Sequence, residues 1–164
     1  MKEIPLSQGK IAVVDDEDYP KLMKHKWCAA RTGYGRSYYA VRGERVEGKT
    51  RTVLMHREIL QAPLGTNIDH IDGDGLNNTK ANLRFCTAAE NGWNKGVNRQ
   101  NTSGYKGVFF ATRIGRWMAV IRVNGKRIEL GRFTSKEAAA EAYNAAAAKF
   151  HGTFARLNGI PAEV

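Results

Sequence analysis

The chain has 164 residues, of which 42% are hydrophobic and 26% are charged, and this composition excludes disorder along the whole chain. A chain of this length forms one domain or two small ones rather than a large enzyme. No stretch approaches the roughly 18 uninterrupted apolar residues of a membrane span, and no secretory signal is expected at the start of the chain. Cys28 and Cys86 lie far apart. A cysteine-rich zinc site is therefore excluded, and a reducing, cytoplasmic location is expected.

The net charge of +10 favours a polyanionic partner, either nucleic acid or an anionic membrane. Residues 1–60 carry 12 basic and 8 acidic side chains, residues 61–95 carry 3 and 4, and residues 96–164 carry 11 and 4. This distribution is expected if both flanks hold a phosphate backbone and the middle holds a cation. Charge alone establishes no function, because a solvated basic surface has the same composition.

Residues 1–60 predict a β-rich region with short helical pieces. Its helices are expected after the acidic cluster of residues 15–18 and before Pro63. A turn near Glu47 and Gly48 is expected to join two of its strands. The expected strands are 10–14, 38–41 and 52–55, and the expected helices are 19–27 and 56–61.

Residues 61–95 are dense in Gly, Asn and Asp, and their apolar spans are short. Two brief strands are expected over 68–71 and 83–86, separated by a loop. Thr87 and Glu90 form a capping box, which predicts a helix through about Lys95. The polar segment 96–102 shows no periodicity and is interpreted as a linker.

Residues 103–158 predict a compact module of three strands and one helix. The strands are expected over 108–110, 117–123 and 127–130, with Asn124-Gly125 as a hairpin turn. Thr134 and Glu137 form a second capping box. It opens a helix with eight alanines between Ala138 and Ala148, which ends at Gly152. The whole chain is therefore predicted to be α+β, with a small ββα core in the middle and this sheet-and-helix module at the C-terminus.

The middle segment contains an ordered set of chemically capable residues. Asp69-His70 ends a predicted strand, Asn82 follows 13 residues after Asp69, and Asn91 follows 22 residues after it on a predicted helix. Hydrolysis of a phosphodiester needs a base for water, and histidine titrates near neutral pH. It also needs a hard cation, which prefers carboxylate and amide oxygens. One Mg²⁺ (or Mn²⁺) fits what this segment supplies.

The run from Asp69-His70-Ile71-Asp72-Gly73 through Leu76-Asn77-Asn78, with Asn82-Leu83-Arg84 and Glu90-Asn91, resembles the HNH nucleases of the phage and intron homing type, which have a ββα-metal fold. The resemblance implies that His70 is the general base and that Asp69 and Asn91 hold the metal. It implies that Asn82 braces the loop and orients the base. The third motif position is Asn rather than His, as in homing members of the family. The products implied are 5′-phosphate and 3′-hydroxyl ends.

For several residues of this region, a purely structural role is an alternative to a functional one. Asn82 and Asn91 are also typical of turns and helix starts, and Asp72 and Asp74, which alternate with glycines, favour turn chemistry over metal binding. His56 is either a second functional histidine or a helix-packing residue. His25 and His151 are assigned to structure or surface, and Cys86 is expected to be a small buried side chain.

Residues 103–158 resemble the plant ethylene-response-factor (Apetala-two type) DNA-binding domain. The resemblance rests on Tyr105-Lys106-Gly107-Val108, Gly115-Arg116-Trp117, Leu130-Gly131 and the helix segments Glu137-Ala138-Ala139 and Ala142-Tyr143. It implies a sheet that lies in the DNA major groove. The basic residues on or near the groove-facing positions are Lys106, Arg113, Arg116, Arg122 and Arg127.

Phe109, Ala111 and Glu129 depart from the plant pattern, so the plant target sequence does not transfer. The same cations could instead form a solvated sheet face. Further contacts to DNA are expected from the N-terminal region, through Arg36, Arg42, Arg45 and Arg51.

The combined interpretation is that the chain is an HNH homing endonuclease that acts on double-stranded DNA. It is expected to use a divalent metal, and neither a small-molecule cofactor nor a membrane partner is expected. A monomer is favoured. The alternative is a non-catalytic DNA-binding regulator with a relic nuclease motif. An RNA target is less expected, because a broad sheet fits the B-form major groove better than the deep, narrow groove of A-form RNA.

Overall fold

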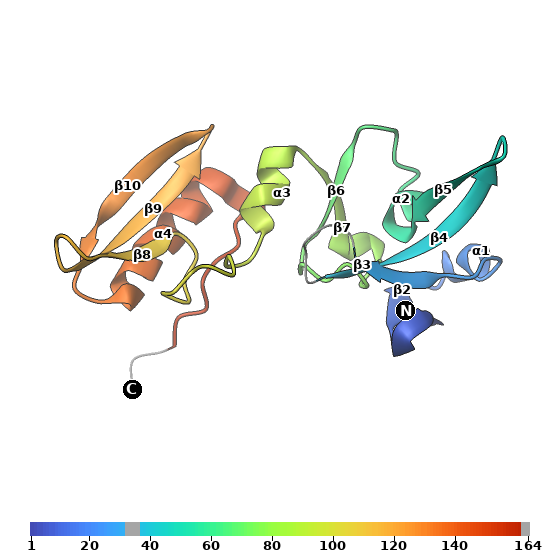
Figure 1. Ribbon diagram of the computed structural model, residues 1–164, viewed down its shortest axis with the longest axis horizontal. Helices are drawn as coiled ribbons and strands as arrows, with labels where there is room; N and C mark the ends of the chain where they lie inside the picture. Colours follow the sequence, from blue (N-terminus) through green and yellow to red (C-terminus); the bar gives the residue numbers. More distant parts are fainter. Residues whose placement is uncertain (32–36, 162–164) are drawn as a thin grey trace. The chain divides into compact units, whose positions relative to one another are not determined.

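A computed structural model describes residues 1–31 and 37–161. The chain forms two compact units, Met1–Ala88 and Ala89–Val164, and Figure 1 shows the elements of each. The predicted α+β fold is confirmed, with antiparallel sheets and short helices in the first unit and a three-stranded sheet packed against one helix in the second. In these described ranges, no helix is long and apolar enough to cross a membrane.

The first unit contains three antiparallel sheets among its described residues. The outer strands of the central sheet both pair with β4, so the order is β3-β4-β5. The strands are β1 (Lys2–Pro5), β2 (Ile11–Val14), β3 (Cys28–Arg31), β4 (Tyr38–Val46), β5 (Lys49–Leu54), β6 (Asn67–His70) and β7 (Leu83–Cys86). The helices are α1 (Tyr19–Leu22), α2 (Met55–Ile59) and the short 3₁₀ turns Ser7–Gly9 and Lys80–Asn82.

One hydrophobic core joins these sheets. Ile4 of β1, Val14 of β2, Met55 of α2 and Leu83 of β7 are all buried in it. The N-terminal strands and the β6–β7 hairpin therefore share one apolar interior, and burial of this interior is the main force that holds the hairpin in place.

Helix α1 and strands β4 and β5 differ in length from the prediction. Helix α1 ends at Leu22 rather than near Trp27, because Trp27 folds back and its Nε1–H donates to the carbonyl of Leu22 at 2.8 Å. Strands β4 and β5 are longer than predicted and meet at Glu47 and Gly48. Both turn residues have positive φ, 49° and 78°, as a two-residue hairpin turn requires.

The second unit begins in the first turn of α3. Its sheet has the order β10-β9-β8 with antiparallel pairing throughout. Its elements are α3 (Ala88–Asn94), β8 (Val108–Ala111), β9 (Arg116–Val123), β10 (Lys126–Phe133), α4 (Lys136–His151) and the 3₁₀ turn Gly152–Phe154. Asn124 and Gly125, with φ of 50° and 77°, form the predicted turn between β9 and β10.

Helix α4 covers one face of the sheet (Figure 1). The small side chains Ala139, Ala140 and Ala147 are fully buried there, next to Ala119 and Ile121 of β9. The alanine-rich sequence thus allows the helix to pack close to the strands.

The start of α4 corrects one prediction. Its N-cap is Ser135, whose Oγ accepts from the N–H of Ala138 at 3.1 Å, and not Thr134. Both side chains are competent caps. Ser135 is the cap because it directly precedes the first helical residue, Lys136. The helix ends at Gly152, as predicted.

Candidate active site

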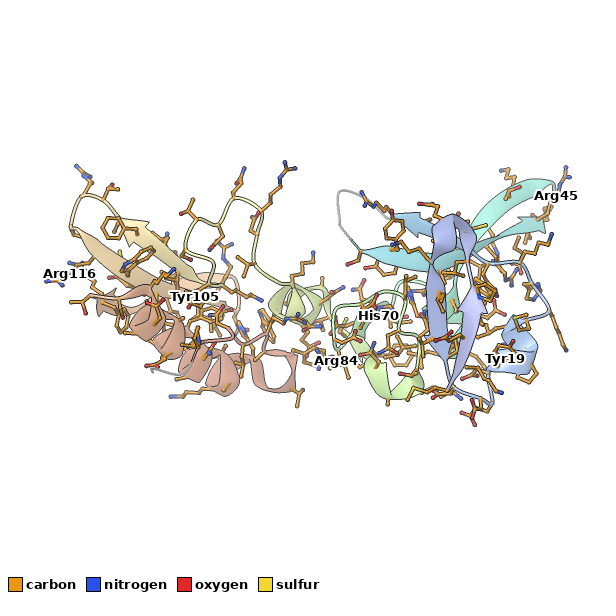
Figure 2. All side chains as sticks on the ribbon, turned by 90° about the horizontal axis from the view of Figure 1, so that it is seen from below. Tyr19, Arg45, His70, Arg84, Tyr105 and Arg116 are labelled. Atoms are coloured by element: carbon orange, nitrogen blue, oxygen red, sulfur yellow. The ribbon has the colours of Figure 1, made fainter. Side chains whose placement is uncertain are left out.

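The β6–β7 hairpin carries the first two residues of the predicted motif. Asp69 and His70 end β6, with only 5% and 6% of their surface exposed. The antiparallel register sets Asp69 opposite Arg84 and His70 opposite Leu83. Leu83 is buried in the core, so this pairing fixes the end of the hairpin on which His70 lies. Figure 2 labels His70 and Arg84.

Arg84 compensates the buried charge of Asp69. Its Nε and Nη2 both donate to Oδ2 of Asp69, at 2.9 and 2.7 Å. A buried carboxylate persists as an anion when a cation or hydrogen-bond donors accompany it. Arg84 therefore holds in place the carboxylate that the motif assigns to a metal.

The side chain of Asn82 closes the loop of residues 72–78. Its Oδ1 accepts from the N–H of Asp72 at 3.0 Å, and its Nδ2 donates to Asp72 Oδ1 and to the carbonyl of Asn77, at 2.9 and 2.8 Å. Asp72 also accepts from the N–H of Asp74 at 2.8 Å. Burial by itself raises the pKa of Asp72, but these donors bring it below its usual value. The amide of Asn82 thus makes the contacts that a bracing role requires, and Asp72 serves the turn.

Asn78 contacts the imidazole of His70 from inside this loop. It is fully buried, and its Oδ1 lies 3.3 Å from His70 Nε2. The Nδ2 of Asn78 faces the carbonyls of Leu76 and Gly75, at 3.1 and 3.5 Å. Carbonyls only accept hydrogen bonds, so the amide nitrogen belongs on their side and the amide oxygen faces the ring. Neutral His70 therefore carries its proton on Nε2 and its lone pair on Nδ1.

Strands of the N-terminal region hold the same loop. The N–H of Val13 donates to the carbonyl of Leu76 at 2.9 Å, and the N–H of Asn78 donates back to Val13 at 2.8 Å. Gly75 lies so close to β4 that an added Cβ would stand 2.4 Å from the carbonyl oxygen of Tyr38. The loop is thus fixed from two sides, and a residue with a side chain does not fit at Gly75.

Three rings pack together beside the hairpin. The rings of His56 and His70 lie edge to face, with centroids 5.0 Å apart, and the ring of Tyr39 lies 5.8 Å from each. His56 is buried, and among the described residues its Nδ1 has no hydrogen-bond partner. His56 therefore packs against the predicted base. The two roles that the sequence left open for His56, a functional histidine or a packing residue, would both be exercised through this contact with His70.

Burial keeps both histidines neutral. It lowers the pKa of His56 to about 3. It also lowers the pKa of His70 below the ordinary value, although the hydrogen bond to Asn78 and the charges of Asp72 and Asp69 act in the opposite direction. At neutral pH the imidazole of His70 is therefore in the form that accepts a proton.

Asn91 lies on α3, in the second unit. Its assignment to a metal remains a prediction from the motif. Of the predicted site residues, the structure brings Asp69, His70 and Asn82 together on one hairpin and its loop.

The donor set of the motif fits a hard cation. Asp69 offers a carboxylate and Asn91 an amide carbonyl, and oxygen donors of this kind suit Mg²⁺ and Mn²⁺. Within the described parts of the chain, no group of three or more His, Cys, Asp or Glu side chains could hold a metal ion. The set assigned by the motif is thus one carboxylate and one amide, a composition that leaves room for water and phosphate oxygens.

The sheet face opposite α4 is basic. Arg122 of β9 lies directly across from Arg127 of β10, and the guanidinium of Arg127 lies 5.3 Å from the ring centre of Phe109. Arg116 begins β9 and Arg113 lies in the turn before it, and all four arginines are exposed. Figure 2 shows the side chain of Arg116 extending away from the sheet.

Lys106 differs from these four arginines. Its ammonium group donates to the backbone carbonyls of Trp93 and Lys95, the latter at 2.7 Å. Burial lowers its pKa to about 8. In this structure Lys106 is engaged with the end of α3 rather than displayed on the sheet face.

The arginines predicted in the N-terminal region have different surroundings. Arg42 is bound by Glu58 and Glu44, at 3.0 and 3.1 Å, and Arg51 also pairs with Glu44. Arg45 is exposed near the end of the β4–β5 hairpin (Figure 2). Arg36 lies outside the described residues.

The residues that the sequence reading missed are those that contact the motif from elsewhere. Asn78 and Arg84 belong to the quoted motif but had no assigned role, and Tyr39 had none at all. The predicted strand bounds did not set Arg84 across from Asp69; the observed register does, and the signal that could have indicated the contact is an arginine on the strand that returns past Asp69. Cys86, expected to be buried, is half-buried, while His151 is buried, which agrees with a structural role.

Part of the chain is similar to plant proteins. It is 47% identical over 62 residues to the AP2-like ethylene-responsive transcription factor TOE2 of Arabidopsis thaliana, which covers 38% of this chain and 13% of the plant protein. The likeness is therefore that of one small region. No solved structure matches the chain significantly.

The nuclease motif is matched independently. A family model described as HNH endonuclease matches residues 61–93. The chain is 36% identical over 95 residues to "Protein 3.8" of Escherichia phage T7, covering 58% of this chain and 78% of the phage protein. It is 32% identical over 159 residues to "Uncharacterized HNH endonuclease L560" of Acanthamoeba polyphaga mimivirus, covering 93% of this chain and 77% of the viral protein. With the buried Asp69-His70 hairpin and its Asn82-bound loop, this near full-length similarity shows that the chain belongs to the HNH endonuclease family.

Proposed function

We propose that this protein hydrolyses phosphodiester bonds of double-stranded DNA as a metal-dependent endonuclease of the homing type, with His70 as the general base. The observation that carries the proposal is the environment of His70. Its imidazole is buried and neutral, its Nε2 lies 3.3 Å from Asn78 Oδ1, and Asp69 directly precedes it on β6. Membership of the HNH family supports nuclease chemistry at this hairpin.

In the proposed reaction His70 removes a proton from water. The proton goes to Nδ1, because Nε2 already carries one that it donates to Asn78. The oxygen of that water attacks phosphorus, the bond between phosphorus and the 3′ oxygen breaks, and the departing 3′ oxygen takes a proton from solvent water. The products are a 5′-phosphate and a 3′-hydroxyl. The carboxamide oxygen of Asn78 stabilises the imidazolium that forms, as a hydrogen-bond acceptor on the opposite ring nitrogen does in other histidine bases.

Asp69 and Asn91 would hold one Mg²⁺ or Mn²⁺. When bound, the cation neutralises charge that develops on the phosphate and on the leaving oxygen. Arg84 keeps the Asp69 carboxylate in position by binding one of its oxygens. Asn82 keeps the loop that carries Asn78 in its closed form.

The second unit would supply affinity for DNA through its arginine face, which consists of Arg113, Arg116, Arg122 and Arg127. The direct pairing of Arg122 with Arg127 supports this role. Like charges opposite each other on a sheet destabilise the free protein, whereas a phosphate or a guanine edge between them would be bound by both. Lys106 is left out of this face, because its ammonium group binds backbone carbonyls.

The test is cleavage of supercoiled plasmid with Mg²⁺ or Mn²⁺, with and without EDTA. The substrates include DNA that flanks the gene, because a rare target is otherwise missed. We expect metal-dependent cleavage that His70→Ala abolishes. His25→Ala removes an exposed imidazole and serves as the matched control, which should cleave like the wild type.

Two outcomes would contradict the proposal. Cleavage that survives in His70→Ala would remove its role as base. Absence of cleavage on every substrate, with tight and salt-sensitive DNA binding retained, would instead favour a DNA-binding regulator with an inactive nuclease motif.

A further inference from the structure

Helix α3 is fastened to the C-terminal module, which we define as the β8–β10 sheet with α4. The ammonium group of Lys106 donates to the carbonyls of Trp93 and Lys95. These carbonyls lie at the C-terminal end of α3, where the helix leaves acceptors without partners of its own. A cation at this end is also favoured by the helix dipole. Lys106 therefore terminates α3 by both hydrogen bonding and charge.

Lys106 is itself tied to α4. Its backbone N–H donates to Asn158 Oδ1 at 2.7 Å, and Asn158 Nδ2 donates back to the Lys106 carbonyl at 3.1 Å. Asn158 in turn exchanges two hydrogen bonds with the side chain of Asn144 on α4, at 2.7 and 3.0 Å. A continuous set of hydrogen bonds thus runs from α4 through Lys106 to α3.

A second connection joins α3 to the sheet. The ring of Trp93 stacks on that of His151 at the end of α4, with centroids 4.3 Å apart and planes within 7° of parallel. His151 is buried, and its Nε2 lies 3.0 Å from the carbonyl of Arg122 on β9. Because a carbonyl only accepts, this Nε2 carries a proton and donates it. Trp93 is thereby linked to the strand that carries part of the arginine face.

We propose that the C-terminal module positions α3, and with it Asn91, so that the module that binds DNA also presents a metal ligand of the nuclease. Lys106 and His151 are the positioning residues, acting through the backbone at the end of α3 and through Trp93. The proposal rests on the proposed function, in which Asn91 binds the metal.

The surroundings of Lys106 favour this role over a contact to DNA. Lys106 is half-buried and burial lowers its pKa to about 8, whereas Arg113, Arg116, Arg122 and Arg127 are exposed. Turning the ammonium group toward a phosphate would leave two carbonyls at the end of α3 without their donor, which costs free energy.

The experiment measures amide hydrogen exchange of residues 88–95 in the full chain, with and without Mn²⁺, for Lys106→Met, Lys106→Arg and Lys149→Met. We expect exchange in Lys106→Met to be faster by about tenfold, and we expect a higher Mn²⁺ concentration to be needed for protection. Lys106→Arg, which keeps the charge and donors, should restore slow exchange at least in part. Lys149→Met removes an exposed cation of α4 and should exchange like the wild type.

Trp93→Ala provides a second variant in case Lys106→Met unfolds the module. It removes the stack on His151 but no side chain of the two core clusters of the second unit. We expect the same fast exchange of residues 88–95, with unchanged thermal unfolding of the second unit.

DNA binding and cleavage complete the test. In Lys106→Met we expect the Kd for DNA to stay within about twofold of the wild type, and the metal concentration for half-maximal cleavage to rise about tenfold. Unchanged exchange in both Lys106→Met and Trp93→Ala would overturn the proposal. A weaker Kd with a smaller salt dependence would overturn it too, since Lys106 would then be a phosphate contact. If the wild type does not cleave DNA under any condition, the proposed function fails, and the exchange data still decide whether the module holds α3.

Discussion

The rings of His56 and His70 meet edge to face, with centroids 5.0 Å apart and planes at 90°. His56 is thus the side chain against which the proposed base rests. Because burial lowers the pKa of His56 to about 3, it does not compete with His70 for protons at neutral pH. A charged imidazole at this position would repel the imidazolium that His70 forms when it acts as a base.

The first prediction concerns His56 and pH. In the unfolded chain its pKa is near 6.5, above its value in the folded protein, so folding favours the neutral form. The stability that depends on this form is complete above about pH 6.5 and is lost as the pH falls toward about 3. Relative to His56→Phe, the wild type should lose up to about 1.4 kcal/mol of unfolding free energy per pH unit over this range.

Urea unfolding at several pH values between 4 and 7 checks this prediction. Met55→Leu is the matched control, because Met55 is a buried neighbour in the same helix and has no proton to exchange. The difference in unfolding free energy between Met55→Leu and the wild type should not vary with pH. If the difference in unfolding free energy between His56→Phe and the wild type is also independent of pH, then folding does not lower the pKa of His56.

Much of the fold follows from local sequence signals. The Asn124-Gly125 and Glu47-Gly48 turns were predictable because both positions of a tight hairpin turn need positive φ. Features that depend on contacts between distant segments could not be predicted in this way. Strand β4, for example, continues beyond the predicted 38–41 because its residues up to Val46 pair with β5, and a single strand's sequence does not reveal that pairing.

In the candidate site, too, local features could be predicted from the sequence, whereas contacts between distant segments could not. The spacing of Asp69, His70 and Asn82 within one hairpin was informative, because few residues separate them. The ring packing of Tyr39 and His56 on His70 joins β4, α2 and β6, so it requires the tertiary fold. The ring contacts around His70 could therefore not be predicted from the sequence, whereas the occurrence of Asp69, His70 and Asn82 on one hairpin and its loop could.

The second prediction concerns Asn78. Asn78→Leu removes the acceptor for the Nε2–H of His70, so the orientation and tautomer of the base are no longer fixed. We expect kcat for plasmid cleavage to fall about ten- to a hundredfold, with KM for DNA unchanged. Asn78→Asp offers the control, since a carboxylate still accepts from Nε2 and stabilises the imidazolium. Its loss of activity on acidification should occur at higher pH than in the wild type. A pH profile that does not move would mean that Asn78 does not act on His70.

The third prediction concerns Gly75. An added Cβ would stand 2.4 Å from the carbonyl oxygen of Tyr38 and 2.8 Å from the ring of Tyr39, so the loop must shift away from β4. We expect Gly75→Ala to lower the free energy of unfolding by about 1–3 kcal/mol and to reduce cleavage, because the same loop carries Asn78. Gly43→Ala is the control, since its Cβ meets only a methyl group of Thr50 at 3.4 Å. Equal stability losses in the two variants would contradict the close approach at Gly75.

The fourth prediction concerns the arginine pair of the sheet. In the free protein, Arg122→Gln should raise the thermal unfolding temperature of the second unit slightly, because it relieves the repulsion with Arg127 across the strands. The same variant should weaken DNA binding. If Arg122 contacts a phosphate, the slope of log Kd against log salt should fall in magnitude by about 0.9. If it reads a base edge, affinity for the target should fall by about 1–3 kcal/mol with an unchanged slope.

Fluorescence anisotropy of labelled duplex DNA, titrated over a series of salt concentrations, separates these cases. Lys149→Gln is the matched control, because it removes the same charge from α4, the helix that packs on the other face of the sheet. It should bind DNA like the wild type. If Lys149→Gln weakens binding as much as Arg122→Gln does, DNA responds to net charge alone, and the arginine face is a solvated surface rather than the binding site. If only Arg122→Gln binds more weakly while its free form is more stable, the pair keeps a repulsion that is relieved only when an anion lies between the two guanidinium groups.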